Sequence, residues 1–142
     1  MHTLELLKQI PIFNGLSTDE IKQIEEVSRP LTFDAGTTII REASEGSSMY
    51  ILLKGKVKIT KSENRSSEVF IATLEEGSFF GELSLFDNLP RSSNVIAISD
   101  CRMLHIKKDD FDKVLSENIR ISNLFYKNCL TEYFDRFRKV SQ

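Results

Sequence analysis

The sequence predicts a mainly β domain, a sandwich or barrel of short strands with helices before and after it. Residues 29–107 contain short runs of aliphatic, aromatic and β-branched side chains, separated by turn segments rich in Gly, Asp, Glu and Ser. Residues 1–28 and 108–142 instead carry apolar side chains at helical spacing. A chain of 142 residues is long enough for one domain with its own core and too short for two ordinary ones. We therefore expect a single domain over residues 1–142.

The first 28 residues contain two helical patterns. The first is ended by Pro11, because the residue before a proline is forced out of helical geometry. Ser17 and Glu20 then form a capping box, in which the serine caps a helix and the glutamate reaches back to the cap. This predicts a second helix with a narrow buried stripe of Ile21, Ile24 and Val27.

The β region contains seven runs with the composition of strands. They lie at residues 31–33, 37–40, 49–53, 57–60, 69–74, 94–98 and 103–106. Val57 and Ile59 alternate with lysines, which is the period of a strand with one face in water. Residues 62–68 are all polar and predict the tip of a hairpin.

Two further helices are predicted at the end of the chain. We expect Asp109 to cap the first and Asn118 to cap a longer one that runs to about residue 140. The longer helix has a heptad-like seam of Tyr126, Leu130, Tyr133, Phe137 and Val140, widened by Phe125 and Phe134. Packing against the rest of the domain and a seam between two copies both fit this spacing.

The stretch FFGELSLFDNLPRSSNV, residues 79–95, interrupts the β region and combines groups suited to an anion. Gly81 lets a ligand approach the main chain, and the residues after it are long enough for a short helix whose first N–H groups are unpaired. Arg91 adds a planar cation that matches two phosphate oxygens. Glu82 can accept hydrogen bonds from ligand hydroxyls while Arg91 balances its charge. Phosphate and hydroxyls together indicate a nucleotide or a sugar phosphate.

Other features exclude several classes of function. The formal net charge of −2 gives no general attraction to nucleic acid. The isolated His2 and His105 predict no catalytic metal site, and Cys101 and Cys129 are expected to be buried free thiols. With no secretory pattern at the start and no apolar run near the roughly 20 residues of a membrane helix, we expect a cytoplasmic protein without a membrane segment.

The order of helices, β region with an inserted phosphate loop, and long aromatic helix resembles the cyclic-nucleotide-binding domain family. The most specific part is FGELSL at residues 80–85 followed by PRSS at residues 90–93, which is similar to the family's phosphate-binding cassette. The resemblance covers residues 6–137 approximately. It implies a mainly β fold, an antiparallel β-roll of the double-stranded jelly-roll type over residues 29–107 with the cassette at 79–93. N-terminal helices, a short phosphate-loop helix and two C-terminal helices, which would form a lid or a dimer contact, complete that fold.

The resemblance also implies which groups contact the phosphate and the sugar. After Gly81, the backbone amides of Glu82, Leu83 and Ser84 would meet the cyclic phosphate or the ribose. The Glu82 carboxylate would accept from the ribose 2′-hydroxyl, and Arg91 would hold the exocyclic phosphate oxygens.

Further positions would define the base and its cover. Ser92 would add its amide and hydroxyl near the phosphate, while Ser93 stands where alanine is common in the family. Family members that prefer cGMP often carry threonine directly after the arginine, so the hydroxyl of Ser92 leaves cGMP open, and cAMP is the favoured ligand. The sugar and base would be lined by Ile59, Ile71 and Ala72. The lid candidates over the base are Tyr133, Phe134 and Phe137.

We therefore expect a non-catalytic cyclic-nucleotide sensor or regulatory module in intracellular signalling, with cAMP as ligand and no cofactor or metal. Ligand would pull on the loop 81–92, repack its apolar neighbours and move the helices from residue 109 onward. Its partners would be an effector protein of unknown identity and a second copy bound through the last helix, without membrane or nucleic acid. The alternatives are a degenerate or differently liganded domain acting through protein contacts, and the ligand-binding part of a transcription regulator. A metal enzyme on a similar fold is disfavoured, because no set of histidines lies on adjacent strands.

Overall fold

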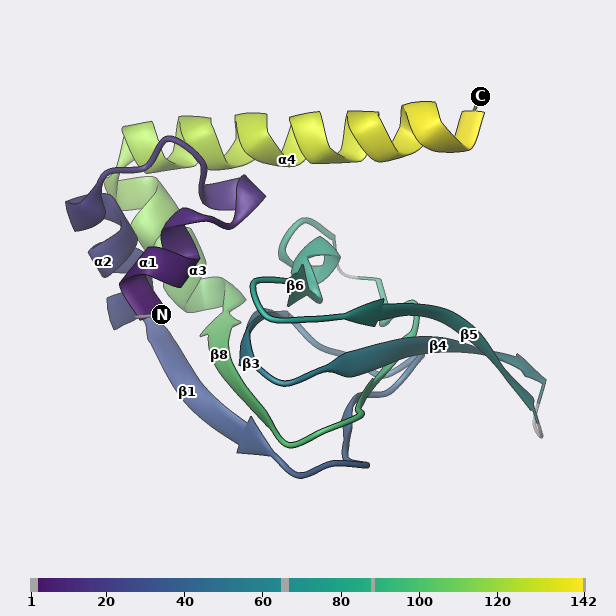
Figure 1. Cartoon of the computed structure of the whole chain (residues 1–142). Coiled ribbons are helices and arrows are strands. Elements are labelled where there is room, and N and C mark those ends of the chain that lie inside the picture. The colour runs from purple at the N-terminus through teal and green to yellow at the C-terminus, as the bar shows by residue number, and fades with distance from the viewer. Residues whose placement is uncertain (1–2, 65–66, 88, 142) are drawn as a thin grey trace. The chain divides into compact units, whose positions relative to one another are not determined.

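The computed structural model describes residues 3–64, 67–87 and 89–141. The chain divides into two compact units (Figure 1). Residues 28–108 form a β unit, and residues 1–27 together with 109–142 form a helical unit.

The β unit consists of two four-stranded antiparallel sheets. The strands are β1 Ser28–Phe33, β2 Thr38–Ile40, β3 Ser48–Lys54, β4 Val57–Asn64, β5 Ser67–Leu74, β6 Phe79–Phe80, β7 Asn94–Ala97 and β8 Cys101–Lys107. One sheet has the order β1-β8-β3-β6 and the other the order β2-β7-β4-β5. The prediction of a mainly β chain with helices at both ends is confirmed.

Strands of both sheets share one apolar core. Its buried members are Ile40, Leu52, Val57, Phe80, Val95, Ala97, Cys101 and Met103. They come from β2, β3, β4, β6, β7 and β8, so that each sheet supplies part of the surface that the other removes from water. The side chain of Cys101 belongs to this core, and Cys129 is buried in the helical unit; both are buried as predicted, and neither forms a disulfide.

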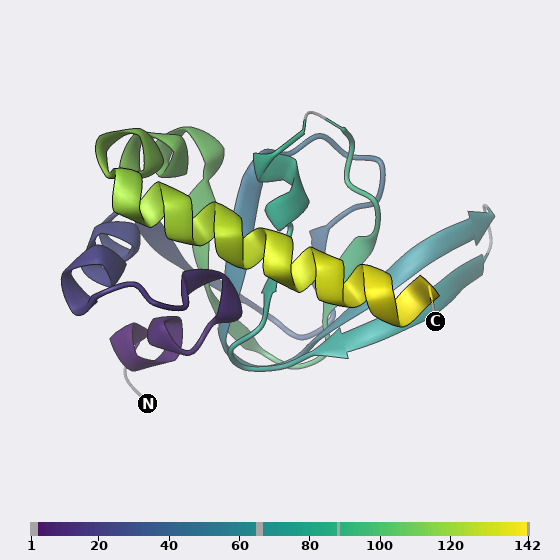
Figure 2. The ribbon, with the colours of Figure 1, turned by 90° about the horizontal axis from the view of Figure 1, so that it is seen from above.

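The strands differ from the predicted runs at two places. The ribbon of β4 and β5, which is the longest pair in Figure 2, extends into the polar segment that we assigned to a hairpin tip. Main-chain hydrogen bonds between strands do not depend on the side chains, so polar residues can continue a strand. The prediction therefore ended β4 too early and began β5 too late. Of that predicted tip, residues 65 and 66 lie outside the described part of the chain. Strand β6 was missed because two residues are too few to show alternation.

The turn between β3 and β4 requires glycine. Gly55 has a φ of +99°, a conformation that other residues adopt only with strain. A Cβ at this position would also lie 2.5 Å from the carbonyl oxygen of Asp100. Both restrictions fix the hairpin at this end of β4.

The helices are α1 Thr3–Lys8, the 3-10 helix η1 Pro11–Phe13, α2 Thr18–Glu26, α3 Lys108–Glu117 and α4 Ile119–Ser141. All belong to the helical unit except the first residue of α3, Lys108, which is the last residue of the β unit. The capping box is confirmed, because the hydroxyl of Ser17 accepts from the backbone N–H of Glu20 and the carboxylate of Glu20 accepts from that of Ser17. Asn118 caps α4 by accepting from the N–H of Ile121 at 3.2 Å, as predicted. Asp109 is not a cap. Helix α3 begins at Lys108, so Asp109 lies in its first turn, where a negative charge still interacts favourably with the helix dipole.

Helix α4 packs within its unit through a stripe that differs from the predicted seam. Ile121, Phe125 and Cys129 are buried, and the ring of Phe125 lies 4.8 Å from that of Phe111 and 6.5 Å from that of Phe13. Tyr126, Leu130, Phe137 and Val140 of the seam are exposed, from 44% for Tyr126 to 85% for Val140, and Tyr133 is half-buried. Phe125 therefore belongs to the packed stripe, whereas Phe134 is exposed with the seam.

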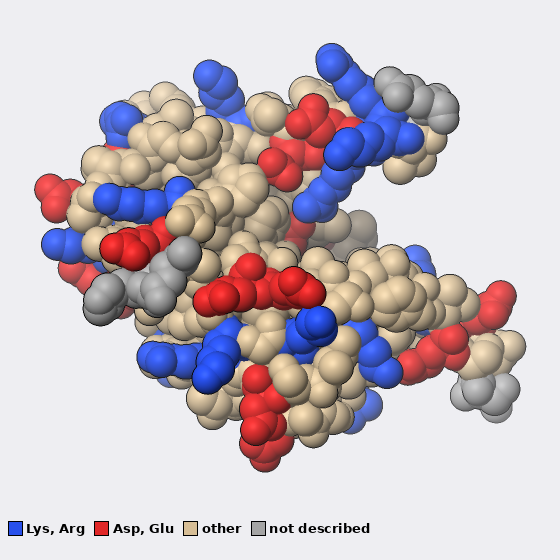
Figure 3. Space-filling model, viewed as in Figure 1, with Lys and Arg blue, Asp and Glu red and all other residues tan. Residues whose placement is uncertain are grey.

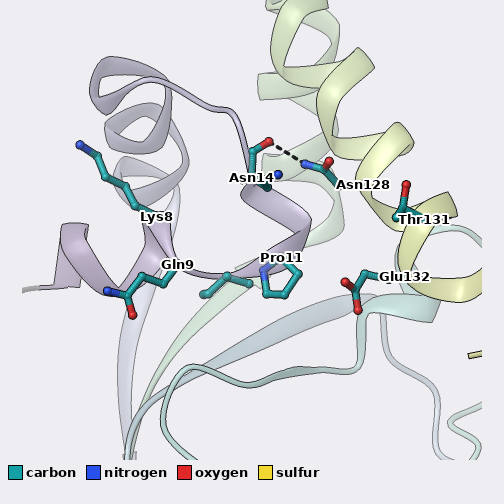
Figure 4. A pocket seen from close by; sticks show the side chains of 8 residues that line it. Lys8, Gln9, Pro11, Asn14, Asn128, Thr131 and Glu132 are labelled. Carbon is teal, nitrogen blue, oxygen red and sulfur yellow. Dashed lines mark hydrogen bonds between the residues drawn. The ribbon is translucent and has the colours of Figure 1, made fainter. Parts of the chain in front are cut away.

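Polar contacts fasten the N-terminal segment to α4. Asn128 donates to the carbonyl oxygen of Asn14 at 2.8 Å (Figure 4). It also donates to the carbonyl oxygen of Ile12 at 3.2 Å. Arg120 forms an ion pair with the carboxylate of Glu20 and donates to the carbonyl oxygen of Gly15 at 3.1 Å. The two ends of the chain thus form one body.

The far end of α4 is strongly basic. Lys and Arg side chains gather there, at the upper right of Figure 3, and the last turn carries Arg138 and Lys139. Positive charge at a helix C-terminus interacts favourably with the carbonyl groups that point out of the last turn.

No described helix is both long and apolar enough to cross a membrane.

Candidate functional site

The loop between β6 and β7 begins with a glycine in a left-handed conformation. Gly81 has a φ of +79° and precedes the 3-10 helix η2 Glu82–Leu85, which is the short helix that the sequence predicts. A Cβ on Gly81 would lie 2.8 Å from Nη1 of Arg91 and 3.1 Å from the carbonyl oxygen of Ser48. Glycine is therefore required here both for its backbone conformation and for the space beside it.

Arg91 folds its guanidinium against this turn and against the start of β3. Nη1 donates to the carbonyl oxygen of Gly81 at 2.9 Å and to the hydroxyl of Ser84 at 3.1 Å. Nη2 donates to the carbonyl oxygen and the hydroxyl of Ser48, both at 3.2 Å. A side chain with a planar array of donors is thus fixed by acceptors from two separate segments.

The loop before β3 encloses the same guanidinium from another side. A Cβ on Gly46 would lie 2.7 Å from Nε and 2.8 Å from Nη2 of Arg91. The backbone of Arg91 pairs with this loop as well, since its N–H donates to the carbonyl oxygen of Ser44 at 2.9 Å and its carbonyl accepts from the N–H of Ala43 at 2.8 Å. Main chain and side chain of Arg91 are therefore both held by residues 43–48.

Two serines in this arrangement were not predicted in these roles. Ser48 was missed altogether, and Ser84 was assigned only through its backbone amide, which here donates to the carbonyl oxygen of Gly81 at 3.3 Å. The hydroxyl of Ser84 instead contacts Ser48 and Arg91, and both serines are buried. The signal available in the sequence was a small polar residue, Ser48, directly before the run MYILL at residues 49–53.

The loop carries the charged residues Glu82, Asp87 and Arg91, of which Arg91 and Glu82 interact with each other. Glu82 is buried, with 7% of its surface exposed. Burial lowers the pKa of Arg91, while Tyr50 and the negative charge of Glu82 raise it and offset part of that effect. A guanidinium keeps its proton at neutral pH in spite of such a shift, so the loop presents a lasting positive charge beside a buried carboxyl group.

An aromatic cluster lies next to the start of β3. The ring of Tyr50 stacks on that of Phe80 at 5.1 Å and contacts the imidazole of His105 at 4.8 Å. Burial lowers the pKa of His105, and the positive charges of Lys107, Arg91 and Arg29 lower it further. A neutral histidine packed on a tyrosine has a structural role here, and among the described residues no group of three or more His, Cys, Asp and Glu could hold a metal ion.

The remaining predicted residues fall in three places. Ser92 and Ser93 follow Arg91 directly, the first exposed and the second half-buried. Ile59 on β4 faces Ala72 on β5 in the ladder, but the next pair is Thr60 with Phe70. Ile71 is therefore the extra residue of a β-bulge, and it is 52% exposed.

Leu83, by contrast, is half exposed on η2. The lid candidates Tyr133, Phe134 and Phe137 lie on α4 in the helical unit, where Phe134 and Phe137 are exposed. The structure thus brings Gly81, Glu82, Ser84 and Arg91 together with Ser48, and it pairs Ile59 with Ala72 on neighbouring strands.

A separate polar hollow occurs within the helical unit (Figure 4). It lies between the N-terminal segment and α4 and is lined by Lys8, Gln9, Ile10, Pro11, Asn14, Asn128, Thr131 and Glu132. None of the predicted ligand contacts belongs to it. The amide of Asn128 is already engaged with the main chain of Ile12 and Asn14.

Comparison with known proteins agrees with this arrangement. A family model described as "Cyclic nucleotide-binding domain" matches residues 30–118. Human cGMP-dependent protein kinase 2 is 36% identical over 111 residues, which are 77% of this chain and 15% of the kinase. The CRP-like cAMP-activated global transcriptional regulator of Mycobacterium tuberculosis is 30% identical over 118 residues, which are 83% of this chain and 53% of the regulator. The chain thus spans about half of one relative and a small part of the other.

A solved structure shows the same fold. The N-terminal domain of a transcriptional regulator from Streptomyces coelicolor A3(2) superposes with a TM-score of 0.86 at 21% identity, covering 96% of this chain and 95% of that one. At this identity the match speaks for the fold alone. It confirms the predicted antiparallel β-roll with helices at both ends.

Proposed function

Because the chain belongs to the cyclic-nucleotide-binding domain family, we propose that the loop around Arg91 binds the phosphate of a cyclic purine nucleotide. One observation carries this proposal. The guanidinium of Arg91 is held against the Gly81 turn by a hydrogen bond to the carbonyl oxygen of Gly81. It fits there only because residues 46 and 81 are glycines, whose missing side chains would otherwise collide with it. Glu82 is buried nearby. A fixed guanidinium offers the paired donors that two phosphate oxygens accept.

The other contacts follow from this position. The carboxylate of Glu82 accepts from the ribose 2′-hydroxyl, and the backbone amides of Glu82 and Leu83 meet the phosphate or the ribose. Ser92 contributes its hydroxyl and amide beside the phosphate. On the second sheet, Ile59 and Ala72 provide apolar contacts to the sugar and base, and Ile71 joins them from its bulge.

We favour cAMP over cGMP as the ligand. Ser92 stands where cGMP-preferring members of the family often have threonine, and its exposed hydroxyl remains available to a guanine amino group. The named relatives include a cGMP-dependent kinase and a cAMP-activated regulator. We expect cAMP to bind more tightly than cGMP because serine, and not threonine, follows Arg91, and titration with both nucleotides measures the order.

We further propose a non-catalytic role in which ligand changes the helices. Bound phosphate draws in the loop, and the exposed Leu83 and Phe86 change their packing as it moves. Tyr133, Phe134 or Phe137 covers the base, and the exposed seam of α4 joins two copies or contacts an effector protein. Two buried cysteines without a disulfide fit a reducing compartment, so we place the sensor in the cytoplasm.

A second candidate has the same site in a different setting. The chain would be the ligand-binding part of a transcription regulator, the setting of the matching segment in the Mycobacterium tuberculosis regulator named above. DNA binding would then require residues outside this chain. Both candidates predict the same ligand, and they differ only in the partner that receives the signal.

Calorimetric titration tests the proposed ligand. We expect cAMP to bind and to raise the unfolding temperature, because a ligand of the folded state stabilises it according to its concentration relative to Kd. Arg91→Ala should weaken binding by about 2–4 kcal/mol, the scale for loss of a buried charged partner. Arg102→Ala, an exposed arginine on β8, is the matched control and should bind like the wild type. Wild-type affinity in Arg91→Ala, or no binding of cAMP and cGMP to the wild type, would refute the proposal.

A further inference from the structure

The hydroxyl of Ser84 has no hydrogen-bonding capacity left for a ligand. A serine hydroxyl can donate once and accept twice. Here it accepts from the N–H of Ser48 at 3.2 Å and from Nη1 of Arg91 at 3.1 Å. Its single hydrogen lies within reach of the carbonyl oxygens of Gly81 at 2.8 Å and Ser48 at 3.1 Å. With 5% of the residue exposed, this hydroxyl interacts with the protein alone.

The guanidinium of Arg91 is bonded unequally along its edges. Both N–H bonds of Nη1 are used by Gly81 and Ser84, and both of Nη2 by the carbonyl and hydroxyl of Ser48. Nε–H donates to no residue among those that the structure describes. A phosphate takes two neighbouring N–H groups of a guanidinium. It can therefore use Nε and Nη2 in place of the bonds to Ser48, while Nη1 keeps its two anchors.

We propose that Ser84 is a positioning residue, whose hydroxyl fixes the Nη1 side of Arg91 and thereby aims the Nε and Nη2 side at the ligand. This inference rests on the proposed binding of phosphate by Arg91. It adds to Ser84 a role that its backbone amide cannot supply, because only the hydroxyl joins Arg91 to the N–H of Ser48. Serine at this position links the η2 turn, β3 and the arginine in one polar network.

Loss of this hydroxyl has a defined consequence. In Ser84→Ala, the N–H of Ser48 and one N–H of Nη1 lose their acceptor in a buried place, which is costly unless the groups rearrange. The guanidinium is then held at Nη1 by Gly81 alone, and it turns more freely about the Nε–Cζ bond. Ligand must fix that orientation again when it binds.

A double-mutant cycle on cAMP binding tests the inference. We expect Ser84→Ala to raise the Kd about 5- to 10-fold in the wild-type background, the effect of one net hydrogen bond. In an Arg91→Lys background, which lacks the planar fork, the same substitution should change the Kd less than about twofold. Ser99→Ala removes a hydroxyl that accepts from the N–H of Lys56 and serves as the matched control with unchanged Kd. An equal loss in both backgrounds, or no loss in either, would overturn the inference.

A measurement without ligand separates this inference from the proposed function. Slow rotation about the Nε–Cζ bond of Arg91, which exchanges Nη1 and Nη2 and is observed by nitrogen NMR of the guanidinium, should become fast in Ser84→Ala and stay slow in Ser99→Ala. Ser84→Cys has nearly the same size but a weak acceptor, so it should behave like Ser84→Ala and replaces it if the alanine variant does not fold. If the wild type binds neither nucleotide, the proposed function fails, and the rotation rate still decides the role of Ser84. Unchanged rotation in the folded variants would refute that role.

Discussion

Replacement of Gly46 by alanine is expected to weaken nucleotide binding with little effect on folding. The new Cβ would lie 2.7 Å from Nε, 2.8 Å from Nη2 and 3.1 Å from Cζ of Arg91. These atoms are the end of a flexible side chain, and Gly46 does not have a left-handed φ. The fold can therefore accept the methyl group if the guanidinium moves away by several tenths of an ångström.

The size of the effect follows from the contacts that this movement breaks. The displaced Nη2 makes two bonds to Ser48, and the phosphate would use the same side of the guanidinium. Losing one interaction of a charged donor is worth about 1.5–3 kcal/mol, which corresponds to roughly a 10- to 150-fold rise in Kd. The free energy of unfolding should fall by less than about 1 kcal/mol, because Arg91 can find other acceptors or water.

Calorimetric titration with cAMP and urea unfolding measure the two effects side by side. Gly36→Ala is the control, because Gly36 has a φ of +89° but nothing within 4 Å of the new Cβ. It should lose about 1–2 kcal/mol of stability through backbone strain and keep its affinity. The reasoning is wrong if Gly46→Ala binds cAMP like the wild type, or if it unfolds as readily as Gly36→Ala while keeping its affinity.

Two further predictions concern stability. Gly55→Ala combines a φ of +99° with a Cβ 2.5 Å from the carbonyl oxygen of Asp100, so it should lower the free energy of unfolding in urea more than Gly36→Ala does. An equal loss in the two variants would contradict the steric argument. Burial alone would raise the pKa of Glu20, but hydrogen bonds from Ser17 and Arg120 and the charge of Arg120 hold it below its usual value. The unfolded state then binds protons more readily, so this contribution is complete above the ordinary glutamate pKa and is lost as pH falls through the lower, folded value. Arg120→Ala should lower the free energy of unfolding by about 1–2 kcal/mol at pH 7 and by less at acidic pH. In Glu20→Gln, the free energy of unfolding should depend less on pH below about pH 5. Thermal unfolding at several pH values measures both effects.

Local signals in the sequence predicted the local structure well. Ser17 with Glu20 and Asn118 act through backbone groups three residues away, so a short pattern contains the whole interaction. The prediction that Asp109 caps α3 was wrong, because Lys108 is already the first residue of the helix although the sequence places it at the end of a strand. Helix boundaries of this kind depend on how the preceding strand ends, which composition does not record.

The predicted site is a combination of near and distant residues. Gly81 and Arg91 lie in one segment and could be recognised together. Ser48 lies 43 positions before Arg91 and meets it only because β3 pairs with β6 at the start of the loop. The bulge at Ile71 is likewise a property of the pairing between two strands, so neither feature is visible in the order of side chains.

The joining of both chain ends in the helical unit sets an order of events during synthesis. Asn128 meets the main chain of Ile12 across 116 positions, and Phe125 is the aromatic partner of Phe13. At about 5–20 residues per second, the ribosome releases the first helices roughly 6 to 23 seconds before their partner helix exists. During that time Ile12 and Phe13 lack the contacts that α4 provides in the folded chain. The β unit, which lies between these segments in the sequence, can fold during this time. It can therefore be complete before the two parts of the helical unit pack together.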